Sequence, residues 1–241
     1  MITRAQIEKL GALHAVEPTI LSLYLGVPRS ANLTARAGEL ITAAEAACGW
    51  PLAARDREWV LARLPPCARD CTGRTVAVFA CADSGLFEVI PLPCPLSERA
   101  VLGVRPHIRP LLLARQHCRV RDQASPDVAW WSEVPARRTV ATILAMPPVG
   151  RPAVGLPACL AAVGAGSVQT LVVPADGLVP GYECGRCGTL SLDADACCPD
   201  WGTAALPVPD VIEEMVSRVL EDGGDVLVAG GGWSQSRVRL L

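Results

Sequence analysis

Short apolar runs and longer stretches with helical spacing alternate along this chain. The run PTILSLYLG at residues 18–26 predicts a buried strand, and RTVAVFACADSGLFEVIPLP at 74–93 predicts a β-hairpin. Between them, two helices are predicted at 34–48 and 53–64, and the second is expected to end before Pro65-Pro66. The first half of the chain therefore mixes helices and strands.

The C-terminal part shows the same alternation more clearly. LPACLAAVGA at 156–165 predicts a short helix, and SVQTLVVP at 167–174 predicts a strand. PVPDVIEEMVSRVLED at 207–222 is the clearest helix, with one apolar face, and DVLVAG at 225–230 predicts the last strand. Because helices and strands follow each other in turn, an α/β layer structure is predicted.

The prolines between these two parts predict a division of the chain. We expect an N-terminal α/β domain at 1–121, a proline-rich connector at 122–150, and a C-terminal domain at 151–241. The predicted fold class is thus α/β with two small α/β domains. The C-terminal domain is expected to be an α/β layer structure with an inserted cysteine-rich hairpin.

Composition narrows the class of protein. Hydrophobic residues make up 51% and charged residues 19% of the 241 residues, which is typical of a globular chain. The net charge of -2 excludes a molecule that binds nucleic acid through its overall charge, so such binding would need a local basic patch. With no signal-like N-terminus and no apolar run of about 18 residues, we expect a cytoplasmic protein with no membrane partner. Its cysteines should then be mostly reduced thiols.

The most specific motif is the cysteine-rich stretch at 182–202. Cys184-Gly-Arg-Cys187 has the spacing at which two thiolates bind one tetrahedral Zn²⁺, and Cys198 suits the third position. The fourth position holds Trp201, so only the neighbouring Cys197 or a water would complete the tetrahedron. We therefore expect a weakened structural zinc site; the alternative is a former site whose cysteines pack as small apolar groups.

Basic residues gather before the connector. Guanidinium groups suit phosphate oxygens, so this run is the first candidate for RNA binding, although such runs are also typical of a solvated face. The candidate residues are Arg105, Arg109, Arg115, Arg119 and Arg121. By contrast, Glu213 and Glu214 lie in the first turn of the helix at 207–222, where complementing the helix dipole is their whole expected role.

The C-terminal part resembles a known family. The stretches GLPACLAAVGAGSVQTLVVPADGLVPGYECGRCGTLS and PVPDVIEEMVSRVLEDGGDVLVAGG resemble, in order and spacing, the third domain of the archaeo-eukaryotic class of peptide chain release factors, especially their bacterial relatives. The match covers about residues 155–230, and it implies that the C-terminal domain is an α/β/α sandwich with an inserted cysteine-rich hairpin. ILSLYLGVPRS, RTVAVFACADSGLFEVIPLP and VRPHIRPLL resemble the N-terminal domain of the same bacterial group less closely.

The resemblance has two gaps that limit what it implies. Only the connector stands where the family has its central domain, and the sequence contains no Gly-Gly-Gln, the loop that positions water against peptidyl-tRNA. It therefore implies a non-catalytic relative that binds the ribosome, tRNA or another translation component. One alternative is a structural or protein-interaction module, that is, a shortened paralogue with no translation role. The other is an enzyme of undefined type. No particular oligomeric state is predicted.

Overall fold

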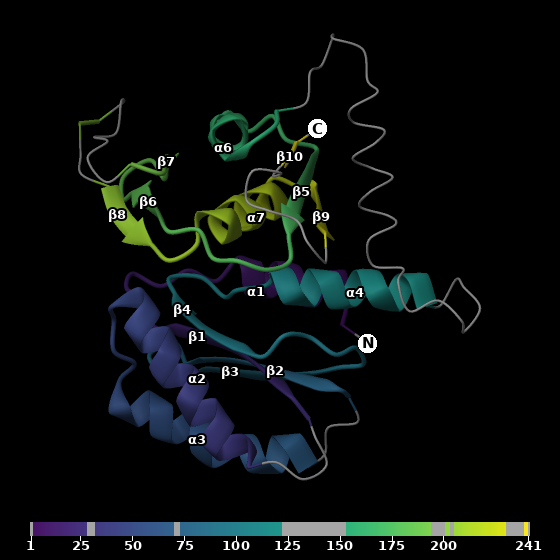
Figure 1. The fold of residues 1–241 in the computed structure, drawn as a ribbon. Helices are drawn as coiled ribbons and strands as arrows, with labels where there is room; N and C mark the ends of the chain where they lie inside the picture. Colours follow the sequence, from purple (N-terminus) through teal and green to yellow (C-terminus); the bar gives the residue numbers. More distant parts are fainter. Residues whose placement is uncertain are drawn as a thin grey trace. The chain divides into compact units, whose positions relative to one another are not determined.

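The structure, a computed structural model, forms two compact units, Met1–His107 and Ile108–Leu241. Both units mix helices and strands, which confirms the predicted α/β fold (Figure 1). The described residues are 2–27, 32–69, 73–121, 153–193, 201–202, 205–229 and 239–240, without the side chains of 65–69, 119–121 and 239–240. The predicted connector at 122–150, like Cys197 and Cys198, lies outside them.

The first unit is a four-stranded antiparallel sheet with helices. In chain order its elements are α1 (Arg4–Gly11), β1 (Ile20–Gly26), α2 (Leu33–Cys48), α3 (Ala54–Arg69), β2 (Thr75–Cys81), β3 (Leu86–Leu92) and β4 (Arg99–Gly103). The strand order is β3-β2-β1-β4. Helices α2 and α3 pack together and against the sheet (Figure 1). The core between them is apolar and includes Leu21, Leu23, Leu25, Ile41, Val60, Leu64, Val76 and Val78.

Most of the predicted elements of this unit are present. The hairpin of β2 and β3 pairs Cys81 with Leu86, and the loop between them has Gly85 at a φ of 68°. Helix α2 begins after Asn32, whose Oδ1 accepts a hydrogen bond from the backbone N–H of Ala35 at 3.2 Å. A side-chain acceptor at this position satisfies an N–H that has no partner within the helix.

Two features of the first unit differ from the prediction. Helix α3 does not end before Pro65-Pro66 but continues to Arg69. A proline inside a helix removes one hydrogen bond and its ring crowds the carbonyl four residues earlier, which disfavours the helix but does not forbid it. Strand β4 was not predicted, because its short sequence, RAVLG, shows no alternation of its own. It is held by antiparallel pairing with β1, which is far away in sequence.

The second unit holds two small sheets and three described helices. Its elements are α4 (Arg109–Arg121), α6 (Leu156–Gly164), β5 (Thr170–Pro174), β6 (Gly181–Cys184), β7 (Leu190–Ser191), β8 (Ala205–Val208), α7 (Val211–Glu221), β9 (Asp225–Ala229) and β10 (Arg239–Leu240). One sheet has the order β10-β5-β9, with β5 and β9 parallel, and the other is antiparallel with the order β7-β6-β8. Both α4 and α7 pack against β9.

Helix α4 belongs to this second unit, whereas the sequence analysis counts its residues with the N-terminal domain. It is tied to β9 by the backbone N–H of Val228, which donates to Gln116 Oε1 at 3.1 Å. Helix α7 begins at the predicted place, because Asp210 accepts from the N–H of Ile212 at 3.2 Å as the N-cap. At its start, Val211 packs so closely on Gly181 of β6 that a Cβ there would lie 2.8 Å from the Val211 Cβ.

Candidate functional site

The cysteine turn, which we define as residues 184–189, connects β6 to β7. The backbone N–H of Gly188 donates to the Cys184 carbonyl at 2.8 Å, and that of Cys184 donates to the Thr189 carbonyl at 2.9 Å. Gly188 has a φ of 76°, a backbone conformation that glycine adopts without strain. These two bonds close the turn and fix where its cysteines lie.

The two described cysteines of the turn differ in exposure. Cys184 is buried, whereas Cys187 is exposed and its Sγ lies 3.1 Å from Thr189 Oγ1. Cys-x-x-Cys at the two ends of a tight turn suits a thiolate zinc site. Since Cys197 and Cys198 lie outside the described residues, the predicted set of four ligands stays a prediction.

Arg218 of α7 braces this turn from the side. Its Nη2 donates to Glu183 Oε1 of β6 at 2.9 Å and also to the carbonyl of Gly188. Both side chains of the ion pair are largely buried, with exposed fractions of 18% and 16%. A side chain of helix α7 is therefore bonded both to strand β6 and to the cysteine turn.

Trp201 occupies the place of the missing fourth ligand and lies beside the turn. The guanidinium carbon of Arg186, which stands between the two cysteines, is 3.7 Å from the centre of the Trp201 ring. Trp201 keeps 50% of its surface exposed. Contact of a guanidinium with an indole face is attractive because the face of the ring carries negative charge density.

The candidate RNA-binding arginines do not form one exposed patch. Arg105 is half-buried and donates to the Gly11 carbonyl at 3.1 Å in the first unit. Arg115 is half-buried on α4, and the side chains of Arg119 and Arg121 lie outside the description. Arg109 is fully buried.

Arg109 is instead the centre of a buried ion network within the second unit. Its Nε donates to Glu213 Oε2 at 3.0 Å, and its Nη2 forms an ion pair with Asp210. Nη1 donates to the Pro174 carbonyl at 3.0 Å and Nη2 to the Gly177 carbonyl at 2.9 Å. A guanidinium with these partners cannot also reach a phosphate, so Arg109 is a structural residue and not a surface contact for RNA.

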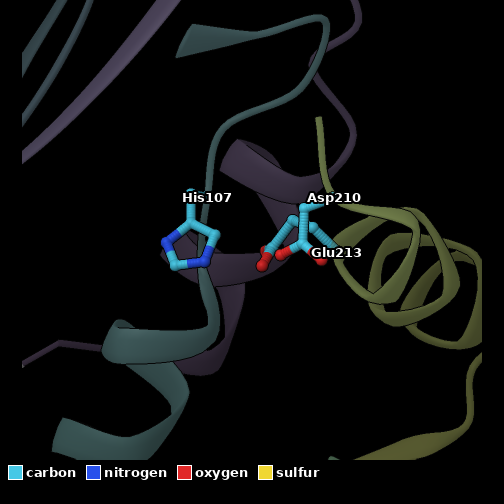
Figure 2. Close-up of side chains that lie close together, drawn as sticks. All are labelled: His107, Asp210 and Glu213. Atoms are coloured by element: carbon cyan, nitrogen blue, oxygen red, sulfur yellow. The ribbon is translucent and has the colours of Figure 1, made fainter. Parts of the chain in front are cut away.

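The two carboxylates of the network are themselves well bonded. Figure 2 shows Asp210 and Glu213 with their carboxylates close together, at and just after the start of α7. Asp210 Oδ1 accepts from the Val179 N–H at 3.1 Å, and Glu213 Oε1 accepts from the Ile108 N–H at 2.5 Å. The network thus joins the start of α4, the loop after β5 and the start of α7.

Burial controls the protonation of these acids. It raises the pKa of Glu213 to about 7, and the attraction of Arg109 offsets only part of this effect. Burial also raises the pKa of Asp210, again opposed by Arg109. In the same unit, burial lowers the pKa of His117, which reduces the positive charge of the basic run near neutral pH.

This role of Glu213 was not predicted from the sequence. An acidic residue in the first turn of a helix is already explained by the helix dipole, which was its whole expected role. Its partner is about a hundred positions away in the chain, at Arg109. One available signal was its place on the buried side of α7, one turn after Asp210.

The sequence matches no protein-family model and no curated protein. Among solved structures, it is similar to the C-terminal domain of a peptide chain release factor from Methanosarcina mazei, with 19% identity, a TM-score of 0.25, and coverage of 50% of this chain and 74% of that one. It is also similar to an archaeal translation termination factor, with 11% identity, a TM-score of 0.26, and coverage of 100% and 98%. With TM-scores this low, neither likeness supports a conclusion about function.

None of the helices in the described part of the chain is long and apolar enough to cross a membrane.

Proposed function

We propose that this chain is a release-factor-like cytoplasmic protein that binds the ribosome, tRNA or another translation component without cleaving peptidyl-tRNA. The supporting observation is the order of elements in the second unit: α6, β5, the cysteine hairpin, α7 and β9, with β5 parallel to β9. This is the order in which residues 155–230 resemble the third domain of the release-factor family. The lack of a Gly-Gly-Gln sequence supports the non-catalytic part of the proposal.

RNA contacts in this proposal come from the basic run of the sequence at 105–121. Arg105, Arg115, Arg119 and Arg121 remain the candidate phosphate contacts, while Arg109 is set aside because its guanidinium is buried in the ion network. Helix α4 is the element on which three of these residues lie. Arginine is suited to this task because its planar fork can bond two phosphate oxygens at once.

A structural zinc is part of the proposal. The zinc would be held by Cys184, Cys187, Cys197 and Cys198. It would link the cysteine turn to the chain before β8 and would take no part in a reaction. Because Trp201 stands where a fourth well-spaced thiolate would be, we expect weak retention of the metal.

The test is Trp201→Cys, with zinc content measured by elemental analysis after dialysis against a mild chelator. Zinc near one per chain and a higher Tm in the variant support a weakened site; one tightly held zinc in the wild type, unchanged by the substitution, contradicts it.

Co-sedimentation with ribosomes over a salt series tests the binding function. If arginines contact phosphates, the logarithm of the binding constant should fall linearly with the logarithm of salt concentration, by about 0.7 to 0.9 per phosphate contact. Replacing Arg115, Arg119 and Arg121 together with alanine should weaken binding and flatten that slope. An unchanged slope in the triple variant would remove α4 as the contact, and no co-sedimentation at low salt would contradict the proposed function.

A protein-interaction module is the second candidate function. The surface around the β7-β6-β8 sheet favours it. Large apolar side chains are exposed there: Leu192 at 42%, beside β7, and Leu206 at 58%, on β8. Single exposed apolar side chains are common, but a contiguous apolar patch is typical of a contact site for another protein, and these two leucines are the candidates for one. In the salt series, this candidate predicts a specific complex whose stability hardly changes with salt.

A further inference from the structure

The pair of Arg186 and Trp201 is an exposed combination of a cation and an aromatic face. The guanidinium carbon lies 3.7 Å from the ring centre, Arg186 is exposed, and half of the Trp201 surface remains open. A guanidinium stacked on an indole is held flat, and its N–H groups then point outward along its edge. The pair therefore presents a π surface and hydrogen-bond donors side by side.

Arg186 combines an aromatic contact with an exposed position. Within the described part of the chain it forms no ion pair, whereas Arg36, Arg57 and Arg218, for example, pair with carboxylates. Arg63 lies over Trp59 and Phe87 in a similar way, but those two rings are half-buried, whereas Trp201 is exposed. An anion from outside would meet the Arg186 guanidinium together with an open aromatic face.

The turn that carries Arg186 is held by several contacts. Arg186 lies in the cysteine turn, which two backbone bonds close and which Arg218 braces through Gly188 and Glu183. On its other side, the position of Gly185 is covered by Leu206, whose Cδ1 would lie 3.4 Å from a Cβ at that glycine. A cation held in place before binding loses less conformational entropy when the ligand arrives.

We propose that Arg186 and Trp201 form a stacking site for an unpaired RNA nucleotide. The base would stack on the open part of the indole, and the adjacent phosphate would accept hydrogen bonds from the guanidinium of Arg186. This occupant is favoured over a protein because an exposed cation beside an open aromatic face matches both halves of a nucleotide, the phosphate and the base. The inference rests on the proposed function, in which the chain binds an RNA-containing component.

The test compares single substitutions in the full chain. The probe is a fluorescein-labelled single-stranded RNA of about 12 nucleotides, and intact ribosomes are the second binding partner. Trp201→Ala should weaken RNA binding by about 5- to 100-fold, and Trp201→Phe should restore most of it, since stacking needs an aromatic face. Arg186→Ala should weaken binding and lower the salt slope by about one phosphate contact.

Trp50→Ala is the matched control. Trp50 is also an exposed tryptophan, at 41%, but it lies in the first unit, away from the cysteine turn in the sequence. Its removal should leave RNA affinity unchanged. Equal Tm values for all variants would exclude a loss of folding as the cause of any weaker binding.

Three outcomes would overturn the inference, and they separate it from the proposed function. If the wild type binds RNA and ribosomes and Trp201→Ala changes neither, the stacking site is wrong while the proposed function stands. If Trp201→Ala weakens only ribosome binding and free RNA never binds, the surface contacts a ribosomal protein and not a nucleotide. If the wild type binds neither partner, both the proposed function and the stacking site are contradicted.

Discussion

Within the described part of the second unit, the guanidinium of Arg109 bonds to two carboxylates and two backbone carbonyl groups. A buried ion pair gains its attraction only after both charges have left water, so it is not a simple source of stability. Removing one partner is far worse, because the remaining charges then stay buried and uncompensated. The contribution of this network to the free energy of unfolding is therefore tested by removing one of its members.

Arg109→Ala should lower the free energy of unfolding by about 3 to 5 kcal/mol, since it leaves Asp210 and Glu213 buried without their cation. Arg186→Ala, an exposed arginine of the same unit, should change it by less than about 1 kcal/mol. Urea denaturation followed by circular dichroism measures both. A loss below about 1 kcal/mol for Arg109→Ala would mean that the network does not hold the unit together.

The raised pKa of Glu213 predicts that the stability of the protein depends on pH. Its pKa in the folded protein, about 7, lies above the ordinary value of 4.5. Between these two values the folded state binds more protons than the unfolded state, so the free energy of unfolding falls as pH rises. The stabilisation is fully present below about pH 4.5 and is lost as the pH rises through about 7. It amounts to at most about 3 kcal/mol.

Glu213→Gln should flatten this decline, because the amide does not titrate. Some slope should remain, since burial raises the pKa of Asp210 in the same direction. Urea denaturation at a series of pH values between about 4.5 and 8 compares the two proteins. Identical slopes in the wild type and the variant would show that Glu213 is not the titrating group.

At the level of elements, close packing at a few glycines positions the cysteine hairpin. A Cβ at Gly181 would lie 2.8 Å from the Val211 Cβ and 2.9 Å from the Ser191 carbonyl oxygen. These atoms belong to the start of α7 and the end of β7, so β6 is held between them without room for a side chain.

Gly181→Ala should therefore destabilise the second unit by about 1 to 3 kcal/mol, because a helix and a strand must move apart. Gly164 in α6 has open space at the position of its Cβ. Gly164→Ala should be neutral or stabilise by up to about 1 kcal/mol, through the lower entropy of the unfolded chain. Thermal unfolding of both variants makes the comparison; equal Tm shifts would contradict the packing argument.

Sequence patterns predicted the elements that have strong local signals. They failed for elements and sites that form only through contacts between residues far apart in the chain. The β2–β3 hairpin and helix α7 followed from alternation and from the cap at Asp210. Strand β4 did not, because it depends on pairing with β1. The same limit applies to the site: the Cys184–Cys187 turn was visible in its spacing, whereas the burial of Arg109 among acids about a hundred residues away was not.

At the scale of the whole molecule, the two units differ in how open their arginine–aromatic contacts are. The first unit is a sheet covered by α2 and α3; its exposed Arg36 and Arg55 are paired with acids, and its Arg63 lies over the half-buried rings of Trp59 and Phe87. The second unit keeps the stack of Arg186 and Trp201 open, and exposes Leu206 beside it. A binding protein without a catalytic loop would use such surfaces for recognition only.

The most direct test of this account is one reaction with ribosomes stalled at a stop codon and carrying labelled peptidyl-tRNA. The wild-type protein is added in excess, and bound protein and released peptide are measured in the same sample, with an active release factor as the positive control. The account predicts protein that co-sediments with the ribosomes and peptide release no faster than in buffer. Release above that background would contradict the non-catalytic assignment, and ribosomes free of the protein would contradict the binding function.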